Sequence, residues 1–71
     1  MIDLKSVGSR IAGRRRERGL TQRQLAALMG VSPQAVSKWE RGLAFPDPAF
    51  FDELAAKLGF TLEELLIGKK S

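Results

Sequence analysis

The chain has 71 residues, which suits one small domain whose single hydrophobic core is close to the lower limit for stability without oligomerisation. It has no cysteine and no histidine, which excludes disulfides, thiol chemistry, a Cys/His zinc site and imidazole catalysis. The net charge of +4 is uneven: residues 1–41 carry nine Lys/Arg against three Asp/Glu, whereas the rest carries three against five, so the first half suits a polyanion.

Signals for membrane insertion, secretion and catalysis are missing from the sequence. No signal peptide or apolar run long enough to span a bilayer is present, so we expect a cytoplasmic protein without membrane contact. The sequence has no glycine-rich phosphate loop, metal-ligand cluster or nucleophile with a neighbouring base. We therefore expect a protein that is not an enzyme and that needs no cofactor and no metal.

A first helix is predicted from near Asp3 or Ser6 to just before Gly19. Three apolar residues and then an arginine follow one another on its inner face: Leu4, Val7, Ile11 and Arg15. The other arginines of the basic last turn point elsewhere around the helix: Arg14, Arg16 and Arg18. This turn is either an ordinary solvated surface or part of a phosphate-binding surface.

Residues 21–41 are predicted to form two short helices joined at a tight corner. Thr21 opens the first of them, with Gln24 three residues later as an approximate capping box. Ala26 is small and Gly30 follows four residues later, which is what two helices crossing steeply through a short turn require. The unit is a helix-turn-helix.

The second helix of this unit has its start and its end marked in the sequence. Ser32 can cap its first turn, Pro33 suits its first position and Gly42 permits a left-handed exit. One face is apolar: Ala35, Val36 and Trp39. The opposite face carries an amide and three donors: Gln34, Ser37, Lys38 and Arg41. Such side chains bind base edges and phosphates in a major groove.

Two further helices and an apolar surplus are predicted after Gly42. Asp47 and Pro48 open a fourth helix that ends at Gly59, and Thr61 begins a fifth through a second capping box. Residues 68–71 are expected to form a frayed tail or a truncation scar. Four apolar residues exceed what the helices need inside and are candidates for a dimer interface: Phe45, Phe50, Phe60 and Ile67.

Taken together, these motifs resemble the phage repressor and Cro type of helix-turn-helix domain. The resemblance runs through GSRIAGRRRERGLTQRQLAALMGVSPQAVSKWERG, then Phe45-Pro46-Asp47, then LAAKLGFTLEELL, and so covers nearly the whole chain. It implies an all-α fold, a compact lambda-repressor-like bundle of five helices formed by residues 1–71 as one domain. It also implies binding to operator DNA, commonly as a dimer on a near-palindromic site.

The resemblance carries several residue roles over by position. Gln22 matches the family's phosphate-contacting glutamine, and Arg41 falls where a further backbone contact is often made. Base edges are contacted by the family from the positions of Pro33, Gln34, Ser37 and Lys38. Pro33 departs from the pattern because its side chain cannot hydrogen-bond a base. We add three arginines to the expected phosphate contacts: Arg14, Arg18 and Arg23.

Arg15 lies on the buried face of the first helix and therefore requires a partner. Glu40 borders the apolar face of the helix over residues 33–40, and the resemblance also places a carboxylate opposite an arginine there. We expect a largely buried ion pair between Arg15 and Glu40 that holds the two helices together.

The expected function is sequence-specific binding of double-stranded DNA by a transcriptional regulator of the repressor type, acting as a homodimer that can form on the DNA. Two alternatives stay open, since a fold does not decide a function. The same bundle can serve as a protein-binding adaptor or an antitoxin-type module. The residues can also be the DNA-binding domain of a longer regulator.

Overall fold

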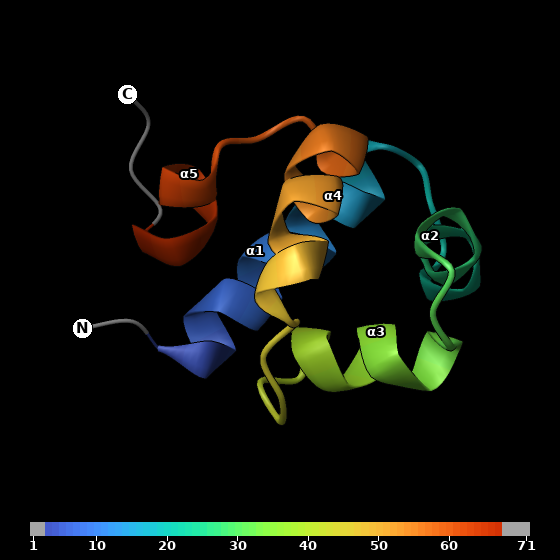
Figure 1. Ribbon diagram of the computed structural model, residues 1–71, viewed down its shortest axis with the longest axis horizontal. Coiled ribbons are helices and arrows are strands. Elements are labelled where there is room, and N and C mark those ends of the chain that lie inside the picture. The colour runs from blue at the N-terminus through green and yellow to red at the C-terminus, as the bar shows by residue number, and fades with distance from the viewer. Residues whose placement is uncertain (1–2, 68–71) are drawn as a thin grey trace.

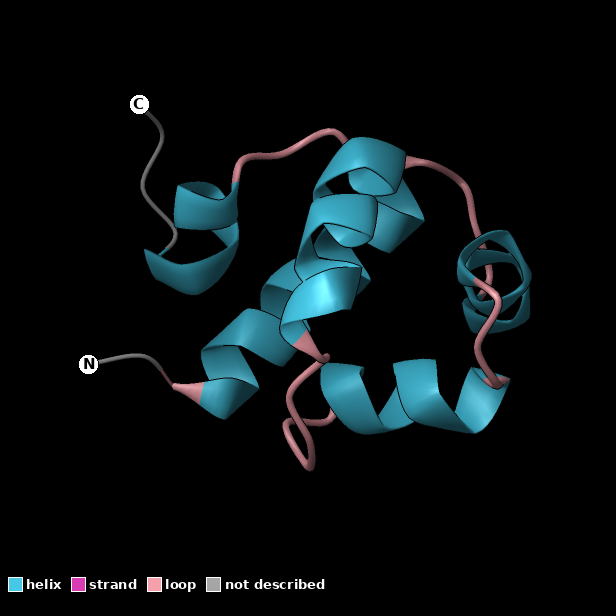
Figure 2. Cartoon of the chain, viewed as in Figure 1, coloured by secondary structure: helices cyan, strands magenta, loops and turns pink. Residues whose placement is uncertain are grey.

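The computed structural model describes residues 3–67, without the side chain of Leu62, so the tail expected at 68–71 lies outside the described residues. Over residues 3–67 the chain forms five α-helices and no strand, as the sequence predicts (Figures 1 and 2). Their bounds are Leu4–Glu17 for α1, Gln22–Met29 for α2, Pro33–Glu40 for α3, Pro48–Leu58 for α4 and Leu62–Ile67 for α5.

Side-chain caps set where most of these helices begin. The Asp3 carboxylate accepts from the N–H of Lys5 at the start of α1, and the Ser32 hydroxyl accepts from the N–H of Ala35 at the start of α3. Reciprocal capping boxes open α2 and α5, formed by Thr21 with Gln24 and by Thr61 with Glu64. The start of α4 differs from the prediction in one respect. Asp47 makes no side-chain capping hydrogen bond there, and Pro48 occupies the first turn.

The corner between α2 and α3 depends on a glycine. Gly30 has φ +69°, a left-handed conformation that residues with a Cβ rarely adopt. Gly30 follows Met29, the last residue of α2, and turns the chain toward α3. In Figure 1, α2 and α3 accordingly lie at a steep angle to each other at one end of the molecule.

The core lies between the helices and draws on all of α1 to α5. Its buried members are Val7, Ile11, Leu25, Ala26, Met29, Val36, Trp39, Leu54, Leu58, Phe60 and Leu65. α3 packs against both α1 and α2, while α5 packs against α1 and α4. Trp39 belongs to this core, and its ring lies 5.8 Å from that of the half-buried Phe50. The core thus fixes the apolar face of α3 inward and its polar face outward.

Candidate nucleic-acid interface

The outward face of α3 presents side chains that are free to bind a partner. Gln34, Lys38 and Arg41 are exposed, and Pro33 and Ser37 are half-buried beside them. The opposite face is closed, because Val36 is fully buried and Trp39 is 6% exposed. No side-chain hydrogen bond or ion pair engages Gln34 or Lys38 within residues 3–67. All five residues expected to lie on this face are therefore brought together by the structure.

Arg41 follows the last residue of α3 and is exposed. Its Nε donates to the backbone oxygen of Ser37 at 3.4 Å, which orients the guanidinium along the end of the helix. The remaining guanidinium N–H groups are available to an anion. Arg41 therefore lies at the C-terminal end of the polar face of α3, beyond Gln34 and Lys38 along the helix.

The N-terminus of α2 is a second donor-rich position near this face. The backbone N–H groups of Gln22 and Arg23 have no acceptor among residues 3–67, and the positive end of the helix dipole favours an anion there. The Arg23 side chain is exposed and makes no hydrogen bond or ion pair to the described part of the chain. α2 packs directly against α3, so both sets of donors belong to one end of the molecule.

A buried ion pair joins α1 to α3 behind these donors, as the sequence analysis expects. Arg15 Nε lies 2.6 Å from Glu40 Oε2, and Arg15 Nη2 donates to Glu40 Oε1 at 3.0 Å. The two side chains are 10% and 5% exposed. The hydrogen bonds to Glu40 raise the pKa of Arg15 above its ordinary value, although burial acts in the opposite direction. Arg15 stays charged, so the pair is a fixed element of the fold.

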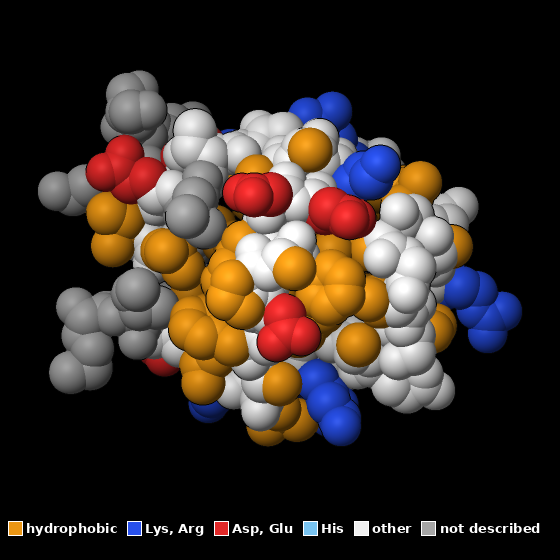
Figure 3. All heavy atoms as spheres, in the orientation of Figure 1, with side chains coloured by type: hydrophobic (Ala, Val, Ile, Leu, Met, Phe, Trp, Pro, Cys, Tyr) orange, Lys and Arg blue, Asp and Glu red, His pale blue; other side chains and the backbone are white. Residues whose placement is uncertain are grey.

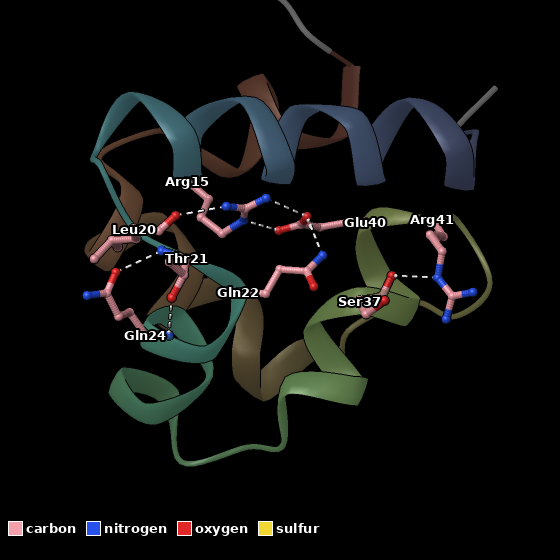
Figure 4. A network of polar contacts seen from close by, with 8 residues as sticks. All are labelled: Arg15, Leu20, Thr21, Gln22, Gln24, Ser37, Glu40 and Arg41. Carbon is pink, nitrogen blue, oxygen red and sulfur yellow. Dashed lines mark hydrogen bonds and ion pairs between the residues drawn. The ribbon is translucent and has the colours of Figure 1, made fainter.

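The ion pair is extended on both sides by neutral partners (Figure 4). Arg15 Nη1 donates to the backbone oxygen of Leu20 at 2.8 Å, which ties α1 to the turn before α2. Gln22 Nε2 donates to Glu40 Oε1 at 2.9 Å. This last contact is an addition to the prediction, in which the amide of Gln22 faces phosphate alone.

Two of the expected phosphate-contacting arginines make contacts within the protein, the half-buried Arg14 and the exposed Arg18. Arg14 Nη2 lies 3.4 Å from Glu64 Oε2, and the Arg14 guanidinium lies 5.9 Å from the centre of the Phe60 ring. Arg18 Nε donates to the backbone oxygen of Leu58 at 3.3 Å. Arg14 thus contacts α5, and Arg18 contacts the end of α4. The expected phosphate role of Arg14 and Arg18 stays a prediction, and these contacts within the protein compete with it.

Arg10 completes this row along α1, and its role is not among those predicted from the sequence. Its Nη1 donates to the backbone oxygens of Leu65 and Leu66 at 3.0 and 3.1 Å, at the end of α5. Arg10, Arg14 and Arg18 follow at intervals of four residues, which places them on one face of a helix. That spacing is a signal visible in the sequence, but the acceptors are more than 35 residues away and periodicity does not identify them.

The four residues predicted to form a dimer interface fall into two groups. Phe45 and Ile67 are exposed, whereas Phe60 is only 7% exposed and Phe50 packs on Trp39. The assignment of Phe60 to an interface is wrong, because this residue of the loop between α4 and α5 is buried in the core. Leu43, 64% exposed in the loop after α3, was missed. Figure 3 shows apolar side chains gathered around α4 on the face toward the viewer.

The family of the chain follows from its sequence as a whole. The profile of the helix-turn-helix family matches residues 11–65, which contain α2, α3 and α4 together with the second half of α1 and the start of α5. The chain belongs to the helix-turn-helix family. An uncharacterised helix-turn-helix-type transcriptional regulator of Sinorhizobium fredii, y4dJ, is 45% identical over 62 residues, which cover 87% of this chain and 80% of that protein.

Two further similarities concern this helix-turn-helix domain. The crystal structure of the P22 c2 repressor in complex with a synthetic operator has a TM-score of 0.84 and 33% identity, over 89% of this chain and 96% of that one. A putative multi-protein-binding factor 1 of Yarrowia lipolytica is 38% identical over 63 residues, 89% of this chain but 41% of that protein. This chain thus spans less than half the length of the yeast factor. Among its described helices, none has the length and apolarity needed to cross a membrane.

Proposed function

We propose that this domain is a cytoplasmic transcriptional regulator that binds double-stranded DNA sequence-specifically, with α3 in the major groove. The observation that carries the proposal is the outward face of α3, which holds only an amide, a hydroxyl and cations, next to the unpaired N–H groups that begin α2. The likeness to a repressor crystallised with its operator supports it.

The exposed residues of α3 divide into two roles by chemistry and position. Gln34 lies in the first turn, where its amide can accept from N6 and donate to N7 of adenine, and Lys38 one turn later can donate to guanine O6 and N7. Ser37 offers a short hydroxyl between them. Pro33 has no donor and makes only apolar contact. Arg41, Gln22 and Arg23 hold phosphates, which set register and affinity.

We further propose that two copies bind a near-palindromic site. A symmetric dimer would place its two copies of α3 about 34 Å apart, in successive major grooves roughly 10 base pairs apart. The interface would use exposed apolar residues beside α3, α4 and α5: Leu43, Phe45 and Ile67. Three exposed residues give a smaller apolar surface than stable dimers bury at their interfaces. The dimer therefore forms mainly on DNA.

Selection of bound duplexes from a random-sequence pool, followed by titration of the selected site, tests these proposals. We expect a two-fold symmetric consensus that binds two chains per duplex and releases them as salt rises. A pool that yields no enrichment over many rounds would exclude sequence-specific binding. Enrichment of a single half-site bound by one chain would retain DNA binding and exclude the dimer.

A second candidate function is docking onto other proteins, and the similarity to the yeast multi-protein-binding factor favours it. The distribution of charge favours DNA, because residues 1–41 carry six more positive than negative charges and α3 presents no carboxylate outward. The same selection separates the two, since a protein-binding module would enrich no DNA sequence. If no DNA sequence were enriched, this chain would be compared with y4dJ in the same selection.

A further inference from the structure

We propose that Glu40 is a positioning residue for DNA binding: through its buried carboxylate it holds the Gln22 amide in one orientation, so that a single N–H remains for a backbone phosphate at the start of α2. This inference rests on the proposed DNA binding. It assigns to Glu40 a role beyond the ion pair with Arg15.

The contact that carries the proposal is a hydrogen bond between the two helices of the helix-turn-helix. Gln22 is the first residue of α2 and Glu40 is the last residue of α3, and Gln22 Nε2 donates to Glu40 Oε1 at 2.9 Å. Figure 4 shows the amide nitrogen directed at the carboxylate and the amide oxygen turned away from it. The phosphate-facing end of α2 is thereby attached to the end of α3.

The carboxylate permits only this orientation of the amide. If the Gln22 amide were turned over, its oxygen would face Glu40 Oε1, and two acceptors would then meet without a proton between them. An amide nitrogen carries two N–H groups, so one remains after the bond to Glu40. This N–H and the free backbone N–H groups of Gln22 and Arg23 form the donor set for one phosphate.

Glu40 can act in this way because hydrogen bonds hold its carboxylate in place and a positive charge offsets its own. Arg15 donates to both of its oxygens, and Arg15 is in turn held by the backbone oxygen of Leu20. A free carboxylate so close to a phosphate would repel it, and the guanidinium of Arg15 offsets that charge. The order of contacts is therefore Leu20, Arg15, Glu40 and Gln22, and the DNA phosphate follows.

The expected benefit is preorganisation. A glutamine that is already held loses little further freedom when it binds, and ordering one flexible side chain corresponds to about 3- to 10-fold in affinity. Glu40→Gln should lower affinity for a selected duplex by that factor through Gln22. Neutralising a carboxylate also raises affinity for any DNA, with or without Gln22. The effect of Glu40→Gln must therefore be compared in the wild-type and Gln22→Ala backgrounds.

The experiment measures the affinity of wild type, Gln22→Ala, Glu40→Gln and the double variant for a 20-base-pair duplex selected by the wild-type chain, at a temperature where circular dichroism shows each variant folded. We expect the loss of affinity caused by Glu40→Gln to be about 3- to 10-fold larger in the wild-type background than in the Gln22→Ala background. Leu58→Val, a core change at the end of α4, controls for lost stability and should change the affinity by the same factor in both backgrounds. Equal effects of Glu40→Gln in the two backgrounds overturn the proposal.

A measurement on the wild-type chain applies even if Glu40→Gln does not fold. In ¹⁵N spectra the two side-chain amide protons of Gln22 give separate signals, as in any glutamine, and only the one that does not face Glu40 should shift on addition of the duplex. A single uncharged methylphosphonate at the contacted phosphate should abolish that shift. Amide signals of Gln22 that ignore the duplex overturn the proposal while DNA binding itself stands. A wild-type chain that selects no duplex overturns the proposed function, and the positioning role with it.

Discussion

Gly8 lies against the backbone of Glu40 where α1 crosses α3. A Cβ built on Gly8 would lie 2.5 Å from the Glu40 carbonyl oxygen and would also meet the carbonyl oxygen of Trp39. Both neighbours are backbone atoms at the end of a helix, so they cannot move aside as a flexible side chain would. The close approach of α1 and α3 therefore depends on a residue without a side chain.

Gly8→Ala should destabilise the domain by about 1 to 3 kcal/mol, because α1 and α3 must move apart to admit the methyl group. Gly13→Ala is the matched control in the same helix. A Cβ on Gly13 meets nothing within 4 Å. That variant should gain about 0.5 to 1 kcal/mol from helix propensity. Urea denaturation of both variants measures the two changes, and a Gly8→Ala chain as stable as the parent would contradict the crossing.

Removing one partner of the ion pair between Arg15 and Glu40 should lower the free energy of unfolding far more than replacing both partners by apolar residues. Glu40→Ala should lower the free energy of unfolding by about 3 to 5 kcal/mol, since it leaves a buried guanidinium without its carboxylate. Replacing both residues by apolar ones, Arg15→Met with Glu40→Leu, should recover most of that loss. Thermal denaturation of Arg15→Met, Glu40→Leu and the double variant measures the coupling. Additive losses would mean that the charges do not stabilise each other.

The sequence predicts most of this fold because its signals are local. Caps such as Thr21 and Ser32, and the glycine at position 30, act within a few residues of themselves, so they locate helix ends without knowledge of the rest of the structure. Arg15 could be assigned a partner because a charge on an apolar face requires one. The outward face of α3 follows from the same periodicity.

The errors and omissions concern contacts between segments far apart in the chain. Arg18 donates to a backbone oxygen of α4. Every residue has a backbone oxygen, so no sequence pattern identifies this acceptor. Phe60 lies between two helices, where helical periodicity does not say which way a side chain points, and it proves to be buried. The bond from Gln22 to Glu40 depends on how steeply α2 crosses α3, which the sequence leaves open within tens of degrees.

Arg14 and Arg23 should differ in their effect on DNA binding although both are arginines of the basic half. Arg23→Gln should reduce the slope of log affinity against log salt by about one unit, since the exposed guanidinium neutralises a phosphate. Arg14→Gln should leave the slope unchanged and lower the melting temperature slightly, because Arg14 pairs with Glu64. Titrations at several salt concentrations measure both slopes. A reduced slope in Arg14→Gln would restore Arg14 to the DNA surface.

Asp3 should make the stability of α1 depend on pH in the acid range. Its hydrogen bonds with the Ser6 hydroxyl and then with the Lys5 N–H lower the pKa of Asp3 below the ordinary value of 3.8. A lowered pKa means that the stabilisation is complete above 3.8 and is lost as pH falls through the folded-state value. Asp3→Ala should therefore melt below the parent at pH 7, and the gap should narrow as pH falls below 3.8. Asp3→Asn keeps a cap without a titrating carboxyl, so its difference in melting temperature from Asp3→Ala should not change over this pH range.

The outward residues of α3 should separate into two classes when single base pairs of the selected site are changed. Gln34→Ala and Lys38→Ala should each lose about 1 to 3 kcal/mol on the preferred duplex and relax preference at one position, leaving non-specific binding nearly intact. Arg41→Ala should weaken binding to all duplexes alike and reduce the salt slope by about one unit.

The reason lies in where each side chain leaves the helix. Gln34 and Lys38 are one turn apart on the exposed face of α3, so both can reach into the groove, whereas Arg41 lies beyond the last turn and is oriented by the Ser37 carbonyl. Competition titrations against a panel of single-base-pair variants rank the sites for each protein. If Gln34→Ala preserved the whole ranking while Arg41→Ala rearranged it, the two roles along α3 would have to be exchanged.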